Sequence, residues 1–157
     1  MISRFKKWRQ QRQLQRELQQ IEERGIHCVA PSFILIEADV ELLRRRERIL
    51  RRHLLGSLTG VVSLDLAKWW LETNEKPFPI IIANAQLPGT EPFAVHGLLE
   101  RDPRWAQVPC VYLAANSMEL RERAHDLGIE DHVFELPVNV RELRTHTSQI
   151  FMKNYRP

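Results

Sequence analysis

The stretch Ile80–Gly89, IIIANAQLPG, decides how the rest of the chain is interpreted. Its apolar run, which ends at Ala83, is typical of a strand that is buried on both faces of a parallel sheet. The run stops at one polar residue, Asn84, and a Pro88-Gly89 turn signal follows. Because functional side chains collect at the carboxyl ends of parallel strands, Asn84 stands where a functional residue is expected.

Strand-like and helix-like segments alternate on both sides of this stretch. Strands are predicted over residues 32–39, 58–64, 77–84, 108–116 and 132–137, and helices over 40–55, 65–74, 91–102, 117–128 and 138–153. Asp39 and Ser117 are suitable helix N-caps, and Gly128 is a suitable helix stop. This alternation predicts an α/β fold class: a three-layer sandwich with a five-stranded parallel sheet and helices on both faces.

The N-terminal part of the chain does not follow this alternation. Residues 2–24 lack Gly and Pro and predict one extra helix that ends at Gly25. We therefore expect a basic amphipathic helix over residues 1–25 and a second region over residues 26–157. Leu14, Leu18 and Ile21 form a stripe that could dock on the body of the protein or form a homodimer. The basic residues could instead bind a membrane surface or nucleic acid.

Composition limits the classes of protein that remain. The chain has 157 residues, 43% of them hydrophobic, and a net charge of +3. Residues 1–53 carry 13 Lys/Arg against 7 Asp/Glu, whereas residues 54–157 carry 10 against 13, so the positive charge is concentrated in the first third. No apolar run approaches the roughly 18 residues of a membrane span, and no secretory signal is present. Two widely separated cysteines favour a reduced, cytoplasmic protein.

Three segments together resemble the receiver domain of bacterial two-component response regulators. LPG over residues 87–89 corresponds to the turn after the phosphoacceptor strand, and LLERDPRWAQVPCVYLAAN over 98–116 corresponds to the third helix, its connection and the fourth strand. AHDLGIEDHVFELPVNVREL over 124–143 corresponds to the end of the fourth helix, the fifth strand and the fifth helix. The resemblance covers about residues 32–153 and implies a receiver, flavodoxin-like fold. No output domain is recognisable after residue 153, which predicts a stand-alone receiver.

The resemblance places the family's phosphorylation pocket on Glu37, Ala38, Asp39, Asn84, Ala114 and Leu136. Asn84 takes the place of the phosphoacceptor aspartate, and Glu37 with Ala38 takes that of the acidic pair, followed by Asp39. Ala114 replaces the hydroxyl residue, and Leu136 replaces the lysine. We therefore expect a degenerate pseudo-receiver.

Each replacement removes one part of the phosphorylation chemistry. The Asn84 amide is not a carboxylate nucleophile, so it cannot form an acyl phosphate. Only Glu37 remains of the acids at these family positions, although Mg²⁺ prefers several anionic oxygens.

Glu37 and Asp39 could form a general acid/base pair, but Asp39 is better explained as the cap of the following helix. No histidine pairs at i, i+4 with another potential metal ligand on an evident face. We expect no enzyme activity, no cofactor and no metal site.

The exposed basic and aromatic residues are the candidates for interaction. Arg44, Arg45, Arg48, Arg51 and Arg52 fall on or beside one face of the helix predicted over 40–55. Such a stripe is either a solvated face, a docking site for an acidic protein helix, or a nucleic-acid contact. Trp69 and Trp70 are adjacent on a short helix, so one of them is expected to be exposed and available to a partner.

The resemblance also implies how the protein works. Arg121 and His125 would lie on the family's usual output face. We expect a phosphorylation-independent module that binds another bacterial signalling protein: a kinase, a phosphotransfer protein or a regulatory protein. The alternative is a nucleic-acid-binding adaptor that uses the basic helices over 2–24 and 40–55, whose affinity would fall steeply with salt.

Overall fold

The computed structural model describes residues 4–23 and 30–155, and the chain divides into two compact units, Met1–Ala30 and Pro31–Pro157. The first unit contains helix α1 (Arg4–Glu23), which confirms the predicted N-terminal helix over its described part. Within α1, Trp8 is 50% exposed and the Arg12 guanidinium lies 4.4 Å from the centre of its ring. The side chains of Leu18 and Ile21, and Gly25 itself, lie outside the described residues, so the docking of this stripe stays a prediction.

The second unit is built on a five-stranded parallel sheet, as the sequence predicts. Its strands are β1 (Ser32–Ile36), β2 (Ser57–Val61), β3 (Pro79–Asn84), β4 (Cys110–Ala114) and β5 (Val133–Glu135). Their order is β2-β1-β3-β4-β5, and the central strands are in register with Ile36 opposite Ala83. Every residue of β1 is buried, which is why its sequence is almost continuously apolar.

The five predicted helices of this unit are present as α2 (Val40–His53), α3 (Leu64–Thr73), α4 (Ala94–Arg101), α5 (Met118–Leu127) and α6 (Val140–Asn154). The Asp39 side chain caps α2 by accepting hydrogen bonds from the backbone N–H groups of Glu41 and Leu42. Ser117 caps α5, and Gly128 ends it in the left-handed conformation with φ of 72°. A short 3₁₀ turn, η1 (Glu130–His132), occupies the start of the predicted strand over 132–137, so β5 begins at Val133.

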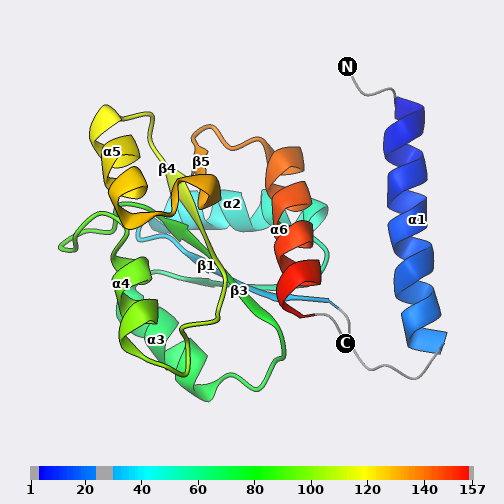
Figure 1. Ribbon diagram of the computed structural model, residues 1–157, viewed down its shortest axis with the longest axis horizontal. Coiled ribbons are helices and arrows are strands. Elements are labelled where there is room, and N and C mark those ends of the chain that lie inside the picture. The colour runs from blue at the N-terminus through cyan, green and yellow to red at the C-terminus, as the bar shows by residue number, and fades with distance from the viewer. Residues whose placement is uncertain (1–3, 24–29, 156–157) are drawn as a thin grey trace. The chain divides into compact units, whose positions relative to one another are not determined.

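The helices form two layers around the sheet. Ile34, Ile81 and Tyr112 join one core cluster with residues of α3, α4 and α5. The intervening strand residues point to the opposite face, where α2 and α6 lie in contact. Figure 1 shows α3, α4 and α5 on one side of the sheet and α6 on the other. Among the described residues, no helix is both long and apolar enough to cross a bilayer.

Candidate functional site at the carboxyl end of the sheet

Glu37 and Asn84 come together because they end two neighbouring strands. Glu37 directly follows β1, and Asn84 is the last residue of β3, which pairs with β1. The Asn84 side-chain Nδ2 donates a hydrogen bond of 2.8 Å to Glu37 Oε2. Its Oδ1 accepts a hydrogen bond of 2.9 Å from the backbone N–H of Gln86. The amide therefore uses both its donor and its acceptor, a pair of roles that an aspartate carboxylate could not fill.

The Glu37 carboxylate is buried, with 2% of the residue exposed, and it is neutralised by an arginine from α2. Arg46 Nη1 contacts Glu37 Oε2 in an ion pair whose side chains are 13% and 3% exposed. The backbone N–H of Asp39 also donates to Glu37 Oε1 at 3.2 Å. A carboxylate at this depth requires such partners, because burying an uncompensated charge is very unfavourable.

Arg46 is the functional residue that the sequence interpretation missed. It is not among the residues that the sequence places in the pocket or on the exposed arginine stripe. The available signal was its spacing: Arg46 is three residues after Leu43 and four before Leu50, and those two leucines are the buried residues of α2. A charged residue on a buried helical stripe needs a buried counter-charge, and Glu37 is the acid at the end of β1 that is not used as a helix cap.

The other residues of the predicted pocket contribute no charge to it. Ala114 is 2% exposed and has no hydroxyl, Leu136 is half-buried and apolar, and Ala38 is half-buried. The Asp39 carboxylate is directed to the helix cap, as the cap interpretation predicts. The site therefore consists of one anion, one cation and one amide. Within residues 4–23 and 30–155, no group of three His, Cys, Asp or Glu side chains is arranged to hold a metal ion.

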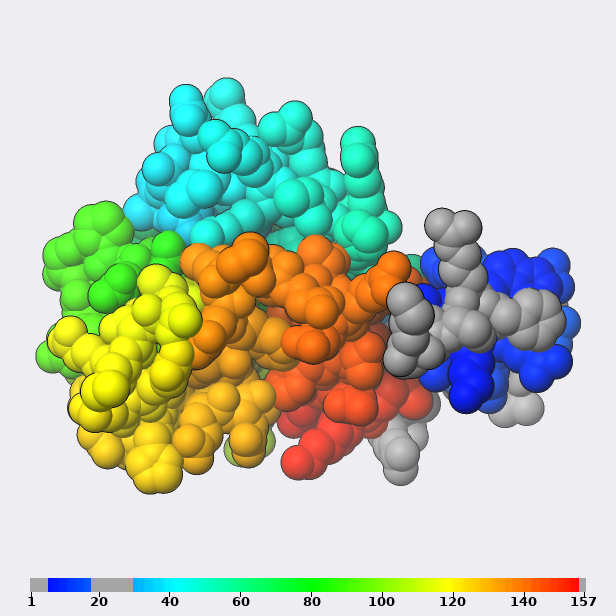
Figure 2. Space-filling view, turned by 90° about the horizontal axis from the view of Figure 1, so that it is seen from above, coloured from blue at the N-terminus to red at the C-terminus, as the bar shows by residue number. Residues whose placement is uncertain are grey.

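The candidate interaction residues lie at separate places on the surface. Arg44, Arg45, Arg48, Arg51 and Arg52 are all exposed on α2, whose surface forms the cyan ridge beside α6 in Figure 2. On this stripe, Arg51 donates to the Leu58 carbonyl at 3.2 Å and also pairs with Glu47.

The two adjacent tryptophans on α3 have different environments. Trp69 is 61% exposed and Trp70 is 7% exposed, so the prediction that one of them is exposed is confirmed. Trp70 belongs to the core cluster between the sheet and α3 to α5. Trp69 is therefore the one of the pair that is available to a partner.

Arg121 and His125, on the predicted output face, each have a partner within the chain. Arg121 Nε lies 2.7 Å from Glu135 Oε1, and His125 Nδ1 lies 3.0 Å from Glu130 Oε2. The hydrogen bond and the charge of Glu130 raise the pKa of His125.

Two contacts between titratable side chains were not foreseen. The expectation that no histidine pairs at i, i+4 with a potential metal ligand was wrong, because His96 Nε2 lies 3.1 Å from Glu100 Oε1 on α4. His132 Nδ1 lies 3.0 Å from His146 Nε2, which joins η1 to α6. The second contact has no local sequence signal, since the two residues are 14 positions apart and meet through the packing of α6.

Solved structures of similar architecture identify the fold. The signal receiver domain of an HD domain-containing protein from Pseudomonas fluorescens Pf-5 superposes with a TM-score of 0.67 at 16% identity, covering 82% of this chain and 99% of that one. The chain has the receiver-domain fold. A signal receiver domain of a signal transduction histidine kinase from Syntrophus aciditrophicus gives a TM-score of 0.69 at 18% identity, covering 82% and 95% of the two chains.

A third structure extends the same result. The receiver domain of the Francisella response regulator 1452 gives a TM-score of 0.64 at 15% identity, covering 78% of this chain and 98% of that one. No family model and no curated protein sequence matches the chain. The receiver fold is therefore retained at sequence identities where few individual residues are shared.

Proposed function

We propose that this chain is a signalling module that binds another protein and acts without phosphorylation of its receiver fold. The observation that carries the proposal is the network Asn84–Glu37–Arg46. The residue at the end of β3 is an amide, which is not a nucleophile for phosphoryl transfer. Because Arg46 already neutralises Glu37, the pocket has no excess negative charge to attract Mg²⁺.

The solved structures of similar fold support the signalling part of the proposal. They are receiver domains of a response regulator, of a signal transduction histidine kinase and of an HD domain-containing protein. A domain of this architecture that cannot be phosphorylated would keep its surfaces for binding in one fixed state. We therefore place its function in a constitutive interaction rather than in a phosphate-dependent switch.

The surface best suited to a protein partner is an apolar stripe on and before α3. Leu66 and Trp69 follow i, i+3 spacing on α3 and are 44% and 61% exposed, and Val62, which is 37% exposed, lies just before the helix. A tryptophan within a cluster of exposed apolar side chains is typical of the centre of a protein interface. Arg121 and His125 are less suited, because each is engaged with a glutamate of the same chain.

The second candidate function is nucleic-acid binding through α2. Arg44, Arg48 and Arg52 are exposed, and none forms an ion pair with another described residue. Three unpaired guanidinium groups on one helical face suit contact with a phosphate backbone. Nucleic-acid binding predicts an affinity that falls steeply as the salt concentration rises, whereas the affinity of binding through the Trp69 stripe would depend on salt much less.

Affinity capture from a bacterial host lysate, with and without nuclease, separates the two functions. Four tagged full-length chains are compared: wild type, Trp69→Ala, Arg48→Glu and Met118→Ala, the last being a control because Met118 is 72% exposed on a different helix, α5. We expect one protein that survives nuclease and is lost only with Trp69→Ala. Loss of all captured material with nuclease would instead support the nucleic-acid function, whereas a nuclease-resistant protein that is lost only with Arg48→Glu would place the partner on the arginine stripe.

A further inference from the structure

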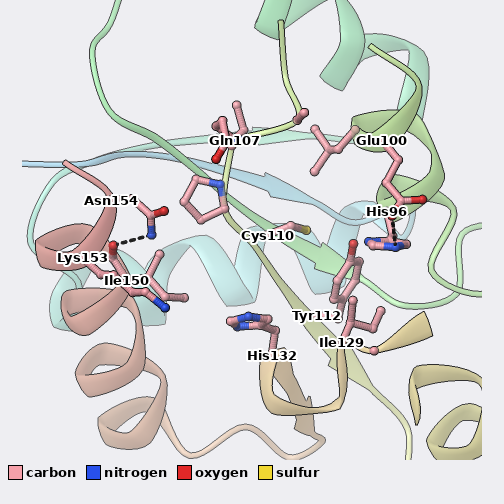
Figure 3. A pocket seen from close by; sticks show the side chains of 15 residues that line it. His96, Glu100, Gln107, Cys110, Tyr112, Ile129, His132, Ile150, Lys153 and Asn154 are labelled. Carbon is pink, nitrogen blue, oxygen red and sulfur yellow. Dashed lines mark hydrogen bonds and ion pairs between the residues drawn. The ribbon is translucent and has the colours of Figure 1, made fainter. Parts of the chain in front are cut away.

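A cavity of 410 Å³ lies at the end of the sheet opposite the Glu37–Asn84 site. It is open to solvent on one side and is lined by α4, the loop before β4, the first residues of β4, the segment from the end of α5 to η1 and the end of α6 (Figure 3). The cavity forms there because β5 is short: its first residue, Val133, pairs with Tyr112, so β5 does not cover the preceding residues Cys110 and Val111. Its volume is within the range of small-molecule sites.

Tyr112 has an unsatisfied polar atom at this cavity. The residue is 1% exposed, and among the described residues its buried hydroxyl has only the Cys110 thiol, a weak acceptor, beside it, with no partner in good hydrogen-bond geometry. In Figure 3 the hydroxyl end of the ring points toward Cys110 and His96. The ring itself is held by Phe93, edge to face, with the ring centres 5.2 Å apart. A buried hydroxyl without a strong acceptor is rare in native proteins, where a water, an ion or a ligand usually satisfies such a group.

The groups around the Tyr112 hydroxyl are the Cys110 thiol, the His96 ring and the Glu100 carboxylate that pairs with His96. Burial, with the Cys110 thiol and the charge of Glu100, raises the pKa of Tyr112, so the hydroxyl remains a donor at physiological pH. Burial also raises the pKa of Cys110 to about 12, so this thiol is uncharged. Lys153, the cation of the lining, comes from α6 on the other side of the cavity, as labelled in Figure 3. An anionic group at the Tyr112 end would therefore face Glu100 without a lysine or arginine beside it.

The rest of the lining suits the apolar part of a bound small molecule. Leu99, Val108, Pro109, Ile129 and Ile150 supply aliphatic walls. We propose that this cavity binds a small uncharged molecule whose carbonyl or similar acceptor takes a hydrogen bond from Tyr112, with its apolar body against these walls. The His96 side chain rotates away to admit the acceptor. This movement is inexpensive, because the Glu100 that holds His96 is 69% exposed and such surface pairs contribute little.

The test is a titration of the ¹⁵N-labelled full chain followed by NMR, using nicotinamide and uracil as probes. Nicotinate and orotate are the matched controls, since each has a similar ring and adds a carboxylate. We expect the neutral probes to shift the amide signals of Cys110, Ile129 and His132, and the carboxylates to bind at least tenfold more weakly. No shift at these residues at millimolar concentrations of either neutral probe, or equal binding of nicotinate and nicotinamide, would overturn the proposal.

Tyr112→Phe then tests the residue itself. We expect this variant to bind the neutral probes roughly tenfold more weakly, as for loss of one hydrogen bond of about 1.5 kcal/mol. A residue with only a structural role would change stability instead, whereas removal of an unpaired buried hydroxyl should leave the melting temperature unchanged or raised. Unchanged affinity in Tyr112→Phe would contradict the proposal. The comparison of neutral and anionic probes uses the unmodified chain, so it stands even if the variant fails to fold.

Discussion

Arg46 and Glu37 form a buried ion pair that joins α2 to the end of β1. The pair lies at the carboxyl end of the sheet, where the sequence resemblance places a phosphorylation pocket, and it brings together a carboxylate, a guanidinium and the Asn84 amide. These contacts within the chain hold the pocket together, and on the proposed function its residues contribute to stability rather than to phosphoryl chemistry.

Replacing Arg46 should destabilise the protein strongly. Arg46→Met leaves the Glu37 carboxylate buried without its counter-charge, and breaking such a pair costs about 3–5 kcal/mol. The free energy of unfolding from urea titration measures the loss. Arg48→Met is the control, because Arg48 is exposed on the same helix and should change stability by at most about 0.5 kcal/mol. The double variant Glu37→Gln/Arg46→Met should recover a large part of the loss. Equal stability of the two arginine variants would show that the pair is not buried in solution.

Asn84→Asp should destabilise the protein without restoring a phosphoacceptor site. The new carboxylate would lose the 2.8 Å hydrogen bond to Glu37 and add a like charge beside it, at a cost of about 1–3 kcal/mol. Millimolar MgCl₂ should recover part of the loss, since Mg²⁺ binds paired carboxylates. Asn116→Asp is the exposed control, and urea titrations compare the variants. No loss of stability in Asn84→Asp would contradict the network described here.

The wild-type chain should not gain a phosphate from acetyl phosphate and Mg²⁺. The physical reason is the amide at Asn84, together with the absence of a hydroxyl at Ala114. Intact-mass spectrometry before and after incubation measures this directly, with a receiver domain that has its aspartate as the positive control. A mass gain of one phosphate that maps to residues 84–89 would overturn the proposed function.

The contact between His132 and His146 should make the protein less stable at acidic pH. Burial and the charge of His132 lower the pKa of His146, and Asp131 acts in the opposite direction. A histidine with a lowered folded-state pKa is protonated more readily in the unfolded chain. Stability is therefore lost as the pH falls from the unfolded value of about 6.5 toward the lower folded value. His132 Nδ1 and His146 Nε2 also cannot share a hydrogen bond once both rings are protonated.

Melting temperatures at several pH values between 8 and 5 measure this effect. His146→Gln should flatten the dependence on pH. His125→Gln is the matched control, because the pKa of His125 is raised and its contribution is present at low pH and lost as the pH rises. Removing His125 should therefore leave the acid sensitivity in place. If the melting temperature of His146→Gln depends on pH as that of the wild type does, other titratable groups cause the acid sensitivity.

Substitutions of the two adjacent tryptophans should have separate effects, one on stability and the other on partner binding. Trp70→Ala removes a core side chain that is 7% exposed, at a cost of about 3–5 kcal/mol. Trp69→Ala should change stability by at most about 0.5 kcal/mol, because its ring is mostly in solvent. Chemical denaturation of the two variants, together with partner capture, checks the expectation. Strong destabilisation by Trp69→Ala would mean that the residue is packed in solution and would remove it as an interface candidate.

Much of the fold could be predicted from local sequence alone. The apolar runs ending at Ile36, Ala83 and Ala114 predict buried parallel strands, and Asp39 and Ser117 mark helix starts that the structure confirms. These features depend on neighbours a few positions away, so one sequence is enough to see them. The boundary of β5 was less predictable, because a 3₁₀ turn at Glu130–His132 replaced its first residue.

The sequence by itself determined the order of the elements, the parallel sheet and the amide at Asn84, the residue that ends the central strand. Tertiary structure alone decided that His132 meets His146 and that a short β5 leaves a cavity beside Tyr112, and it paired Glu37 with Arg46, the arginine of α2 whose spacing places it on the buried stripe. The physical reason is that strand and helix periodicity are local, whereas charge pairing and cavities depend on how separate elements pack against each other. Burial then determines how much each contact contributes to stability, and burial is a property of the folded chain.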